Sequence, residues 1–355
     1  MPLQTCIYKL CLRHPFGLSR DTVQALPTVL VAWGSGLGEA APVRYLGDST
    51  EALAAHCIRL GEALAPLEAR KGHQAARVAL HNSSGPSAAK AAIDVALWDA
   101  EAQAQGVPLT TLLDTTPPKG RQTSLTIALD DPAAMRTRAE EAAAQNTPCI
   151  KIKLGRNPDF DRQVAASIRH AAPHAHLRVD ANAGWSFEQA RDMCRYLADL
   201  GVELVEQPLA IGAYEQVAAL CRESPLPIYL DEDIQGPQSL RELPRDLGVG
   251  GINIKLMKCG GVTPALEMIE LARERGLEVL LGCMIETQVG LRAAAALGSL
   301  VAHLDLDAHL LTTNDPFASH PGEALQGPLQ TDLRQLWDDR PGLALERARF
   351  PHPSD

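Results

Sequence analysis

Charged residues recur at nearly constant intervals through the middle of this 355-residue chain, each at the end of a short apolar run. They are Lys153, Asp180, Glu206, Asp231 and Lys255, and each follows the one before by 24 to 27 positions. In a barrel of alternating strands and helices, one strand, one helix and their loops occupy about 25 to 30 residues. Because the carboxyl ends of all barrel strands meet at one mouth, the spacing predicts that these side chains form a ring there.

Eight segments have the composition of short buried strands, and helical stretches separate them. They are residues 124–129, 149–154, 177–181, 203–205, 228–231, 252–256, 278–281 and 303–306. Eight strands joined by seven helices belong to the α/β class and form a (β/α)7β barrel of the TIM type. We expect residues 120–318 to form this barrel as the catalytic domain.

The first 115 residues follow another pattern, which predicts an α+β capping domain. It contains two strand-like segments and then two that are rich in alanine and helical in composition: residues 5–12, 28–33, 51–67 and 88–105. A Pro-rich break at residues 115–120 marks the boundary. Residues 34–38 have the spacing G-x-G-x-G, but no helical pattern opens after them. We therefore interpret them as a turn and not as a dinucleotide-binding loop.

Charge and hydropathy argue against two classes of partner. The chain has 33 Lys and Arg against 43 Asp and Glu and no basic tract, which disfavours nucleic acid. No apolar stretch reaches the roughly 18 to 20 residues that span a bilayer, so we expect no membrane partner and a cytoplasmic location. The eight cysteines form no C-x-x-C pair, and we interpret them as reduced packing residues.

Three members of the predicted ring are carboxylates on successive strands. Asp180, Glu206 and Asp231 would repel one another without a counter-charge, and their apolar neighbours argue against solvated surface acids. Three carboxylate oxygens directed at one point suit a hard divalent cation. We therefore predict that these residues hold Mg²⁺.

Lysines flank the carboxylates on the second and sixth strands, which lie nearly opposite each other in a closed barrel. Lys153 and Lys255 could remove a proton from one face of a carbon and return it to the other, with a pKa lowered by burial or a nearby cation. For a proton next to a carboxylate, a divalent cation stabilises the enediolate that forms. Lys151 shares the face of Lys153, so it can stabilise the anion or tune Lys153.

Seven motifs carry a resemblance to a known family. They are A-A-I-D-V-A-L-W-D at 91–99, K-I-K at 151–153, V-D-A-N at 179–182, V-E-Q-P at 205–208, D-E at 231–232, N-I-K-L-M-K-C-G-G at 253–261 and P-G-L at 341–343. Together they closely resemble the enolase superfamily, in its muconate-lactonizing subgroup, over nearly the whole chain. The resemblance implies that the three carboxylates bind Mg²⁺, that Lys153 and Lys255 are the acid/base pair, and that residues 319–355 return to complete the capping domain.

Two later motifs resemble those of the dipeptide epimerases: C-M-I-E-T at 283–287 and D-L-D at 305–307. Asp305 and Asp307 share one face of a strand, and the resemblance implies that they hold the α-ammonium group of a dipeptide. The same motifs and strands give three further candidates for substrate binding, Met284, Glu286 and Thr126. Asn182 and Glu232, and also Glu286, are candidates for residues that hold the metal ligands or substrate contacts in place.

A loop near the start of the family's chains closes over the barrel mouth and touches the substrate's side chain, and here it corresponds to residues 15–21. Epimerases that act on Ala-Glu carry an Arg in this loop. Alignment on Pro15 and Phe16 places Asp21 at that position, with Arg20 one residue earlier. An inward Asp21 would favour cationic or neutral dipeptides and an inward Arg20 acidic ones, so the choice stays open.

These features predict an isomerase: a Mg²⁺-dependent dipeptide epimerase that inverts the α carbon of the C-terminal residue of an L,L-dipeptide. N-acyl amino acid racemisation, succinylbenzoate synthesis and cycloisomerisation are alternatives on the same fold, although a neutral N-acyl group would leave the D-x-D carboxylates unpaired. A Schiff-base aldolase is a further alternative. So is a barrel that binds a dipeptide without turnover, and a homo-oligomer is left open.

Overall fold

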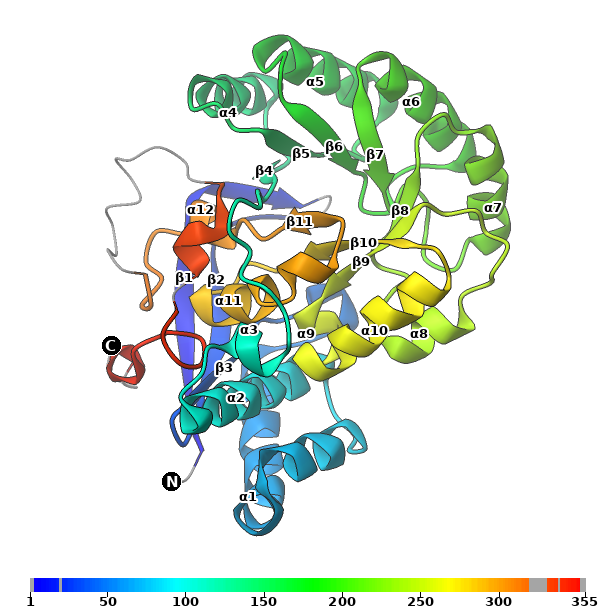
Figure 1. Ribbon diagram of the computed structural model, residues 1–355. Helices are drawn as coiled ribbons and strands as arrows, with labels where there is room; N and C mark the ends of the chain where they lie inside the picture. The colour runs from blue at the N-terminus through cyan, green and yellow to red at the C-terminus, as the bar shows by residue number, and fades with distance from the viewer. Residues whose placement is uncertain (1–2, 19–20, 319–330, 338, 352–355) are drawn as a thin grey trace.

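Eight parallel strands form a nearly closed barrel in the computed structural model, which describes residues 3–18, 21–318, 331–337 and 339–351 (Figure 1). They are β4 (Leu125–Ile127), β5 (Cys149–Lys153), β6 (His176–Asp180), β7 (Val202–Glu206), β8 (Ile228–Leu230), β9 (Gly251–Lys255), β10 (Glu278–Gly282) and β11 (His303–Asp305). Beside the first and last strands, the Ser124 N–H donates a hydrogen bond to the Leu304 carbonyl (3.1 Å). Each predicted strand segment overlaps one of these strands, with ends that differ by at most two residues, so the predicted barrel is confirmed.

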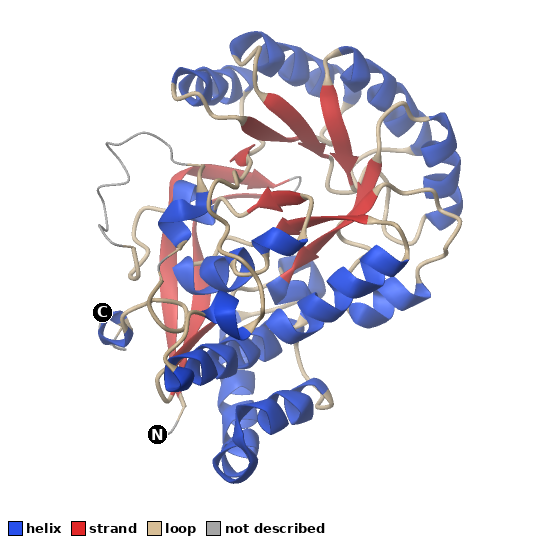
Figure 2. Ribbon diagram, viewed as in Figure 1, coloured by secondary structure: helices blue, strands red, loops and turns tan. Residues whose placement is uncertain are grey.

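Helical segments follow the strands, and the longer ones cover the outside of the barrel (Figure 2). They are α4 (Pro132–Ala144), α5 (Pro158–Ala171), α6 (Phe187–Asp199), α7 (Tyr214–Glu223), α8 (Pro237–Glu242), α9 (Leu256–Cys259), α10 (Val262–Glu274), α11 (Gln288–Ala295), η2 (Gly298–Leu300) and α12 (Ala308–Leu311). Capping residues in the sequence determine where these helices begin. Asn157 caps α5 ahead of a proline, and Ser186 with Gln189 forms a capping box on α6.

The register of the parallel strands places the charged residues next to one another at the carboxyl ends of the strands. Lys153 pairs with Asp180 across β5 and β6, and Asp180 pairs with Glu206 across β6 and β7. On β5, Ile150 and Ile152 belong to the apolar core, while Lys151 and Lys153, which alternate with them, line the pocket at the mouth. Because side chains alternate along a strand, this register converts regular spacing in the sequence into a ring in space.

A three-stranded antiparallel sheet and two long helices form the cap (Figure 1). The elements are β1 (Gln4–Leu18), β2 (Asp21–Trp33), β3 (Gly36–Ala40), η1 (Arg44–Leu46), α1 (Thr50–His81), α2 (Ser87–Gln105) and α3 (Leu109–Leu112). Strand β3 packs against α2, and residues mainly of β2, α1 and α2, with Ala40 of β3, form the second apolar cluster of the molecule. The predicted α+β cap is therefore confirmed.

The interpretation of residues 34–38 as a turn is wrong for three of the five residues, because only the first two form the turn between β2 and β3. Gly36 and Gly38 lie within β3, whose backbone approaches α2 closely. A Cβ on Gly36 would lie 2.0 Å from the carbonyl oxygen of Ala96, and one on Gly38 would lie 1.9 Å from that of Ala92. Glycine is needed here for space between a strand and a helix.

Substituting Gly38 with alanine should lower the free energy of unfolding by about 2 kcal/mol, because the strand would have to move away from α2. Urea denaturation measures this change. Gly34→Asn is the control: its φ is +58°, which asparagine tolerates, and no atom lies within 4 Å of an added Cβ. An unchanged unfolding midpoint for Gly38→Ala would contradict the close approach.

After the barrel, the C-terminal segment contacts the cap. The N–H of Leu343 donates to Asp99 on α2 (2.7 Å), and the N–H of Gly342 donates to the Val107 carbonyl (2.9 Å). The tail also contains η4 (Leu333–Leu336) and η5 (Arg347–Arg349). The predicted start of this segment, residue 319, lies outside the described residues.

Two further findings concern the cysteines and the membrane. All eight cysteines are free thiols, as the sequence predicts, and four of them are buried. In the described part of the chain, every helix is too short or too polar to cross a bilayer.

Candidate active site at the barrel mouth

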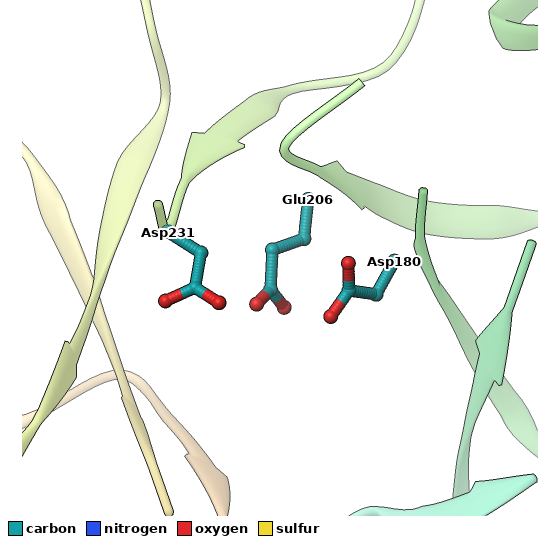
Figure 3. A group of neighbouring side chains, drawn as sticks. All are labelled: Asp180, Glu206 and Asp231. Carbon is teal, nitrogen blue, oxygen red and sulfur yellow. The ribbon is translucent and has the colours of Figure 1, made fainter. Parts of the chain in front are cut away.

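Three buried carboxylates lie side by side where β6, β7 and β8 end (Figure 3). Asp180 and Glu206 are the last residues of their strands, and Asp231 directly follows β8. One oxygen from each carboxylate lies within 4.8 Å of the other two. The residues are 0%, 1% and 1% exposed, so their charges interact in an interior that screens them weakly.

One buried lysine of the site contacts three of the surrounding acids. Lys151 places its Nζ 2.7 Å from Glu206 and 3.1 Å from Asp180. The same ammonium group lies 2.8 Å from Asp305 on β11. Burial lowers the pKa of Lys151, but the charges of these three acids, Asp305 first, outweigh it and raise that pKa well above its ordinary value. Lys151 is therefore a fixed positive charge at the base of the site.

The two lysines of the predicted acid/base pair each contact one end of the carboxylate row. Lys153 Nζ lies 2.6 Å from Asp180, and Lys255 Nζ lies 2.8 Å from Asp231. Lys258, which was not predicted as a site residue, also donates to the Asp231 carboxylate and backbone carbonyl. The row is thus bounded by an amino group at each end.

Burial and the neighbouring charges together set the pKa values of the site. Burial, followed by the charge of Asp180, raises the pKa of Glu206 to about 8. Burial also raises the pKa of Asp231, but Lys255 and Lys258 outweigh it and hold that pKa below the ordinary range. For Lys255, burial lowers the pKa and the carboxylates, Asp231 first, raise it above its usual value.

The residues present fit a divalent cation. All three ligand groups are carboxylates, which hard cations prefer, and their oxygens lie close enough to share one ion. Burial, with the charge of Asp180 second, raises the pKa of Glu206, so the charged form of this acid is disfavoured. A cation at the row would favour that charged form and oppose the effect of Asp231 on the pKa of Lys255.

Asp305 ends β11 and Asp307 lies two residues later, so the D-x-D pair comes from a strand four positions away from β7 in the barrel. Asp305 accepts hydrogen bonds from Ser124 Oγ (2.5 Å) and Lys151 Nζ (2.8 Å). Asp307 accepts one from the Thr126 N–H (2.6 Å) through Oδ2. Burial and then the charge of Asp305 raise the pKa of Asp307 to about 6, so a cation beside it would favour its charged form.

A pocket of about 340 Å³ opens above these groups, between the barrel and the cap, a size that suits a small molecule. Its charged floor contains Lys151, Lys153, Asp231, Lys255, Asp305 and Asp307. Its upper wall is largely apolar: Leu26, Pro27, Pro42, Tyr45, Met284, Ile285 and Leu311. Arg44 and Glu51, two charged residues of the cap that line the pocket, are exposed, so their charge lies at the rim.

Two predicted supports lie next to the carboxylate row. Asn182 donates its side-chain N–H to Glu232 (3.0 Å), and its backbone N–H to Asp180 (2.9 Å). Burial, followed by the charge of Asp231, raises the pKa of Glu232 to about 7. Asn182 has a φ of 43°, a left-handed conformation that asparagine tolerates better than most residues.

The structure places the other candidates differently. Thr126 and Met284 line the pocket, whereas Glu286 is buried behind it and is not among the described lining residues. Arg20 lies outside the described residues. Asp21 begins β2, but its side chain also lies outside what the structure describes. The question of which of these two faces the substrate therefore stays a prediction.

Sequence reasoning missed three groups that shape the site. Lys258 stands one helical turn after Lys255 in the N-I-K-L-M-K motif, a spacing that could have indicated it. Asn253, two residues before Lys255, donates to Glu206 (2.8 Å). The apolar wall from the cap, represented by Leu26, has no signal in the sequence because it depends on how the two domains pack.

Two family descriptions match most of the chain. Residues 4–114 match the mandelate racemase / muconate lactonizing enzyme N-terminal domain, and residues 134–349 match the enolase C-terminal domain-like family. These matches agree with the observed cap and barrel, and they confirm the resemblance stated from the motifs.

Characterised relatives and solved structures agree with this assignment. A hydrophobic dipeptide epimerase of Roseobacter litoralis is 38% identical over 68% of this chain and 71% of the relative. An L-Ala-D/L-Glu epimerase of Bacteroides thetaiotaomicron is 33% identical over 87% of this chain and 80% of the relative. The crystal structure of a dipeptide epimerase from Enterococcus faecalis, complexed with Mg and L-Leu-L-Tyr, has a TM-score of 0.86 at 29% identity and covers 98% of this chain and 99% of that one.

These relatives are isomerases, which confirms the class of enzyme expected from the sequence. The matches to both domains, together with the barrel and its row of carboxylates, lead to one assignment. The chain belongs to the mandelate racemase / muconate lactonizing enzyme family of the enolase superfamily.

Proposed function

We propose that the protein is a Mg²⁺-dependent dipeptide epimerase that inverts the α carbon of a dipeptide's C-terminal residue. The observation that carries the proposal is the row of three carboxylates with an amino group at each end. Lys153 contacts Asp180 at 2.6 Å, and Lys255 contacts Asp231 at 2.8 Å. An α carbon held above this row would present one face to each lysine, which a two-base proton transfer requires.

The side chains divide the work between binding and proton transfer. Asp180, Glu206 and Asp231 would hold Mg²⁺, which when bound supplies positive charge beside the substrate carboxylate. Lys153 or Lys255, as the neutral amine, accepts the α proton, and the other, as the ammonium ion, donates a proton to the opposite face. The cap covers the pocket and limits the access of water to the carbanionic substrate.

The D-x-D pair would recognise the other end of a dipeptide. Asp305 is already held by Lys151 and Ser124, whereas Asp307 accepts a hydrogen bond from the Thr126 N–H through one oxygen. Asp307 is thus the better placed of the two to receive an α-ammonium group, which would also favour its charged form. A neutral N-acyl group offers no such charge, and this favours dipeptides over N-acyl amino acids.

The upper wall of the pocket supports a preference for apolar side chains. Leu26, Ile285 and Leu311 present hydrocarbon to the pocket, and Tyr45 adds an aromatic ring from the cap. Burying a substrate methylene there contributes about 0.8 kcal/mol, whereas burying a charged group without a partner is costly. We infer that dipeptides such as L-Ala-L-Leu react with a higher kcat/KM than L-Ala-L-Glu or L-Ala-L-Lys.

Proton NMR in D₂O tests the proposed reaction directly. With Mg²⁺ and a set of L,L-dipeptides, the C-terminal α-proton signal should disappear while the L,D diastereomer appears, and EDTA should block both changes. N-acetyl amino acids form the comparison arm. If these exchange and the dipeptides do not, the assignment to dipeptides is wrong, whereas no exchange in either arm would contradict the two-base reaction itself.

A further inference from the structure

Two buried carboxylic acids meet where the cap contacts the barrel, and the reaction proposed above uses neither. Glu39 lies on β3 and is 0% exposed, while Glu286 lies in the segment after β10 and is 2% exposed. Both contact Gly290 on α11. Its N–H donates to Glu39 (3.3 Å), and a Cβ added to it would lie 2.0 Å from Glu286 Oε2.

The two acids differ sharply in their hydrogen bonds. Glu39 accepts from the Thr287 N–H (3.0 Å to each oxygen), from Thr287 Oγ1 (2.5 Å) and from Thr28 Oγ1 (2.8 Å). Among the described residues, Glu286 accepts only from the Met284 N–H (3.1 Å), through Oε1. Its Oε2 is buried with no hydrogen-bond partner in the described residues. Hydrogen-bond donors thus surround Glu39, whereas one oxygen of Glu286 is buried without a donor in the described part of the chain.

The charged groups around the pair decide its protonation. Glu39 faces Glu286 and Asp315, and Glu286 faces Glu39 and Lys255. Burial is the largest effect on both acids. It raises the pKa of Glu39 to about 7, although hydrogen bonds from Thr287 and Thr28 lower it, and it raises the pKa of Glu286 well above its ordinary value, with the charge of Glu39 adding to it. Both acids lie next to Gly290, and two negative charges buried in one site are unfavourable, so the pair retains a proton above the ordinary range of a carboxylic acid.

We propose that Glu286 is a positioning residue, held as the neutral acid near the Glu39 carboxylate so that the 283–287 segment stays fixed behind the pocket. The unequal numbers of hydrogen-bond donors support this assignment. Several N–H and O–H groups stabilise a negative charge on Glu39, whereas Glu286 has a single donor and one oxygen without a partner, which suits the neutral acid. Met284 and Ile285 of this segment line the pocket, so their position depends on that proton. When the proton is released to solvent at high pH, repulsion between the two acids would displace the segment.

Thermal unfolding as a function of pH tests the pair without any substrate. The pKa of Glu286 is raised in the folded protein, so the wild type loses stability as pH rises from about 4.5, its unfolded value, through the folded value. Glu286→Gln has the shape of the neutral acid and cannot titrate. Its Tm should match that of the wild type at pH 5 and exceed it by about 3 °C at pH 9.

The matched control is Glu39→Gln. Its side-chain NH₂ would meet the N–H and O–H donors around Glu39, so it should lower the Tm at both pH values. Parallel Tm curves for the wild type and Glu286→Gln would overturn the proposal. The proposal would also be wrong if Glu39→Gln matched the Tm of the wild type at pH 5 and exceeded it at pH 9, because the proton would then reside on Glu39.

The effect on the pocket rests on the proposed function and is measured separately. KM for the best dipeptide should rise between pH 7 and pH 9 in both proteins, because the substrate's α-ammonium group loses its proton there. The rise should be about threefold larger in the wild type than in Glu286→Gln. Equal pH dependence of KM in both proteins would contradict the positioning role. If no dipeptide reacts at all, the proposed function fails, but the Tm comparison still decides whether the acid pair holds its proton.

Discussion

Lys255→Ala should abolish epimerisation and lower kcat about 10³-fold or more, because only one face of the α carbon would still have a base. Lys153 would remain in place at its 2.6 Å contact with Asp180. We therefore expect this variant to exchange the α proton of one diastereomer with deuterium without forming the other. Lys153→Ala should show the reverse preference. NMR in D₂O, started separately from the L,L and L,D dipeptides, measures both.

The fold should tolerate the loss of Lys255, since Lys258 still contacts the Asp231 carboxylate and backbone carbonyl. An unchanged circular dichroism spectrum would establish this. Lys71→Ala is the matched control, because Lys71 is exposed on α1, far from the ring in the chain. Complete epimerisation by Lys255→Ala would contradict the two-base scheme, and loss of exchange from both diastereomers would indicate that Lys153 cannot act alone.

The ring was predictable from the sequence because barrel geometry has few free parameters. Once strands are parallel and connected by helices, residues at strand ends must converge. The register bears this out for Lys153, Asp180 and Glu206, which pair in adjacent strands. The apolar alternation around Lys151 similarly indicates its inward direction.

Features that depend on domain packing were not predictable in the same way. The hydrogen bonds from Thr287 to Glu39 join residues 248 positions apart, and the sequence has no periodic pattern that relates them. Tyr45 and Leu26 reach the pocket only because the cap lies over the barrel.

The glycines of β3 show a second limit on what can be predicted from the sequence. A G-x-G-x-G pattern is compatible with a turn, with a phosphate-binding loop and with close packing, because glycine serves all three. Gly38 is required by a carbonyl oxygen on α2, an element that begins about fifty residues later. Only knowledge of which helix packs on the strand distinguishes these cases.

Glu206→Gln should abolish activity and lower the affinity for Mg²⁺ at least about 100-fold, because it replaces the central charged oxygen ligand with a neutral amide. Glu206 lies within 4.8 Å of both neighbouring carboxylates and 2.7 Å from Lys151. Titration calorimetry with MgCl₂ gives the affinity without any substrate. The Tm should rise with Mg²⁺ in the wild type, as expected for a ligand that binds the folded state, and stay constant in the variant.

Glu203→Gln is the matched control, since Glu203 lies on the same strand but at its other end, where it contacts His176 and Arg178. It is half-exposed, and its ion pairs should contribute at most about 1 kcal/mol, so both Mg²⁺ affinity and activity should persist. Without Mg²⁺, Glu206→Gln should be as stable as the wild type, because the buried acid is already unfavourable beside Asp180. A variant that keeps the Mg²⁺-dependent rise in Tm would show that the central carboxylate is not a ligand, and the metal would then have to lie elsewhere.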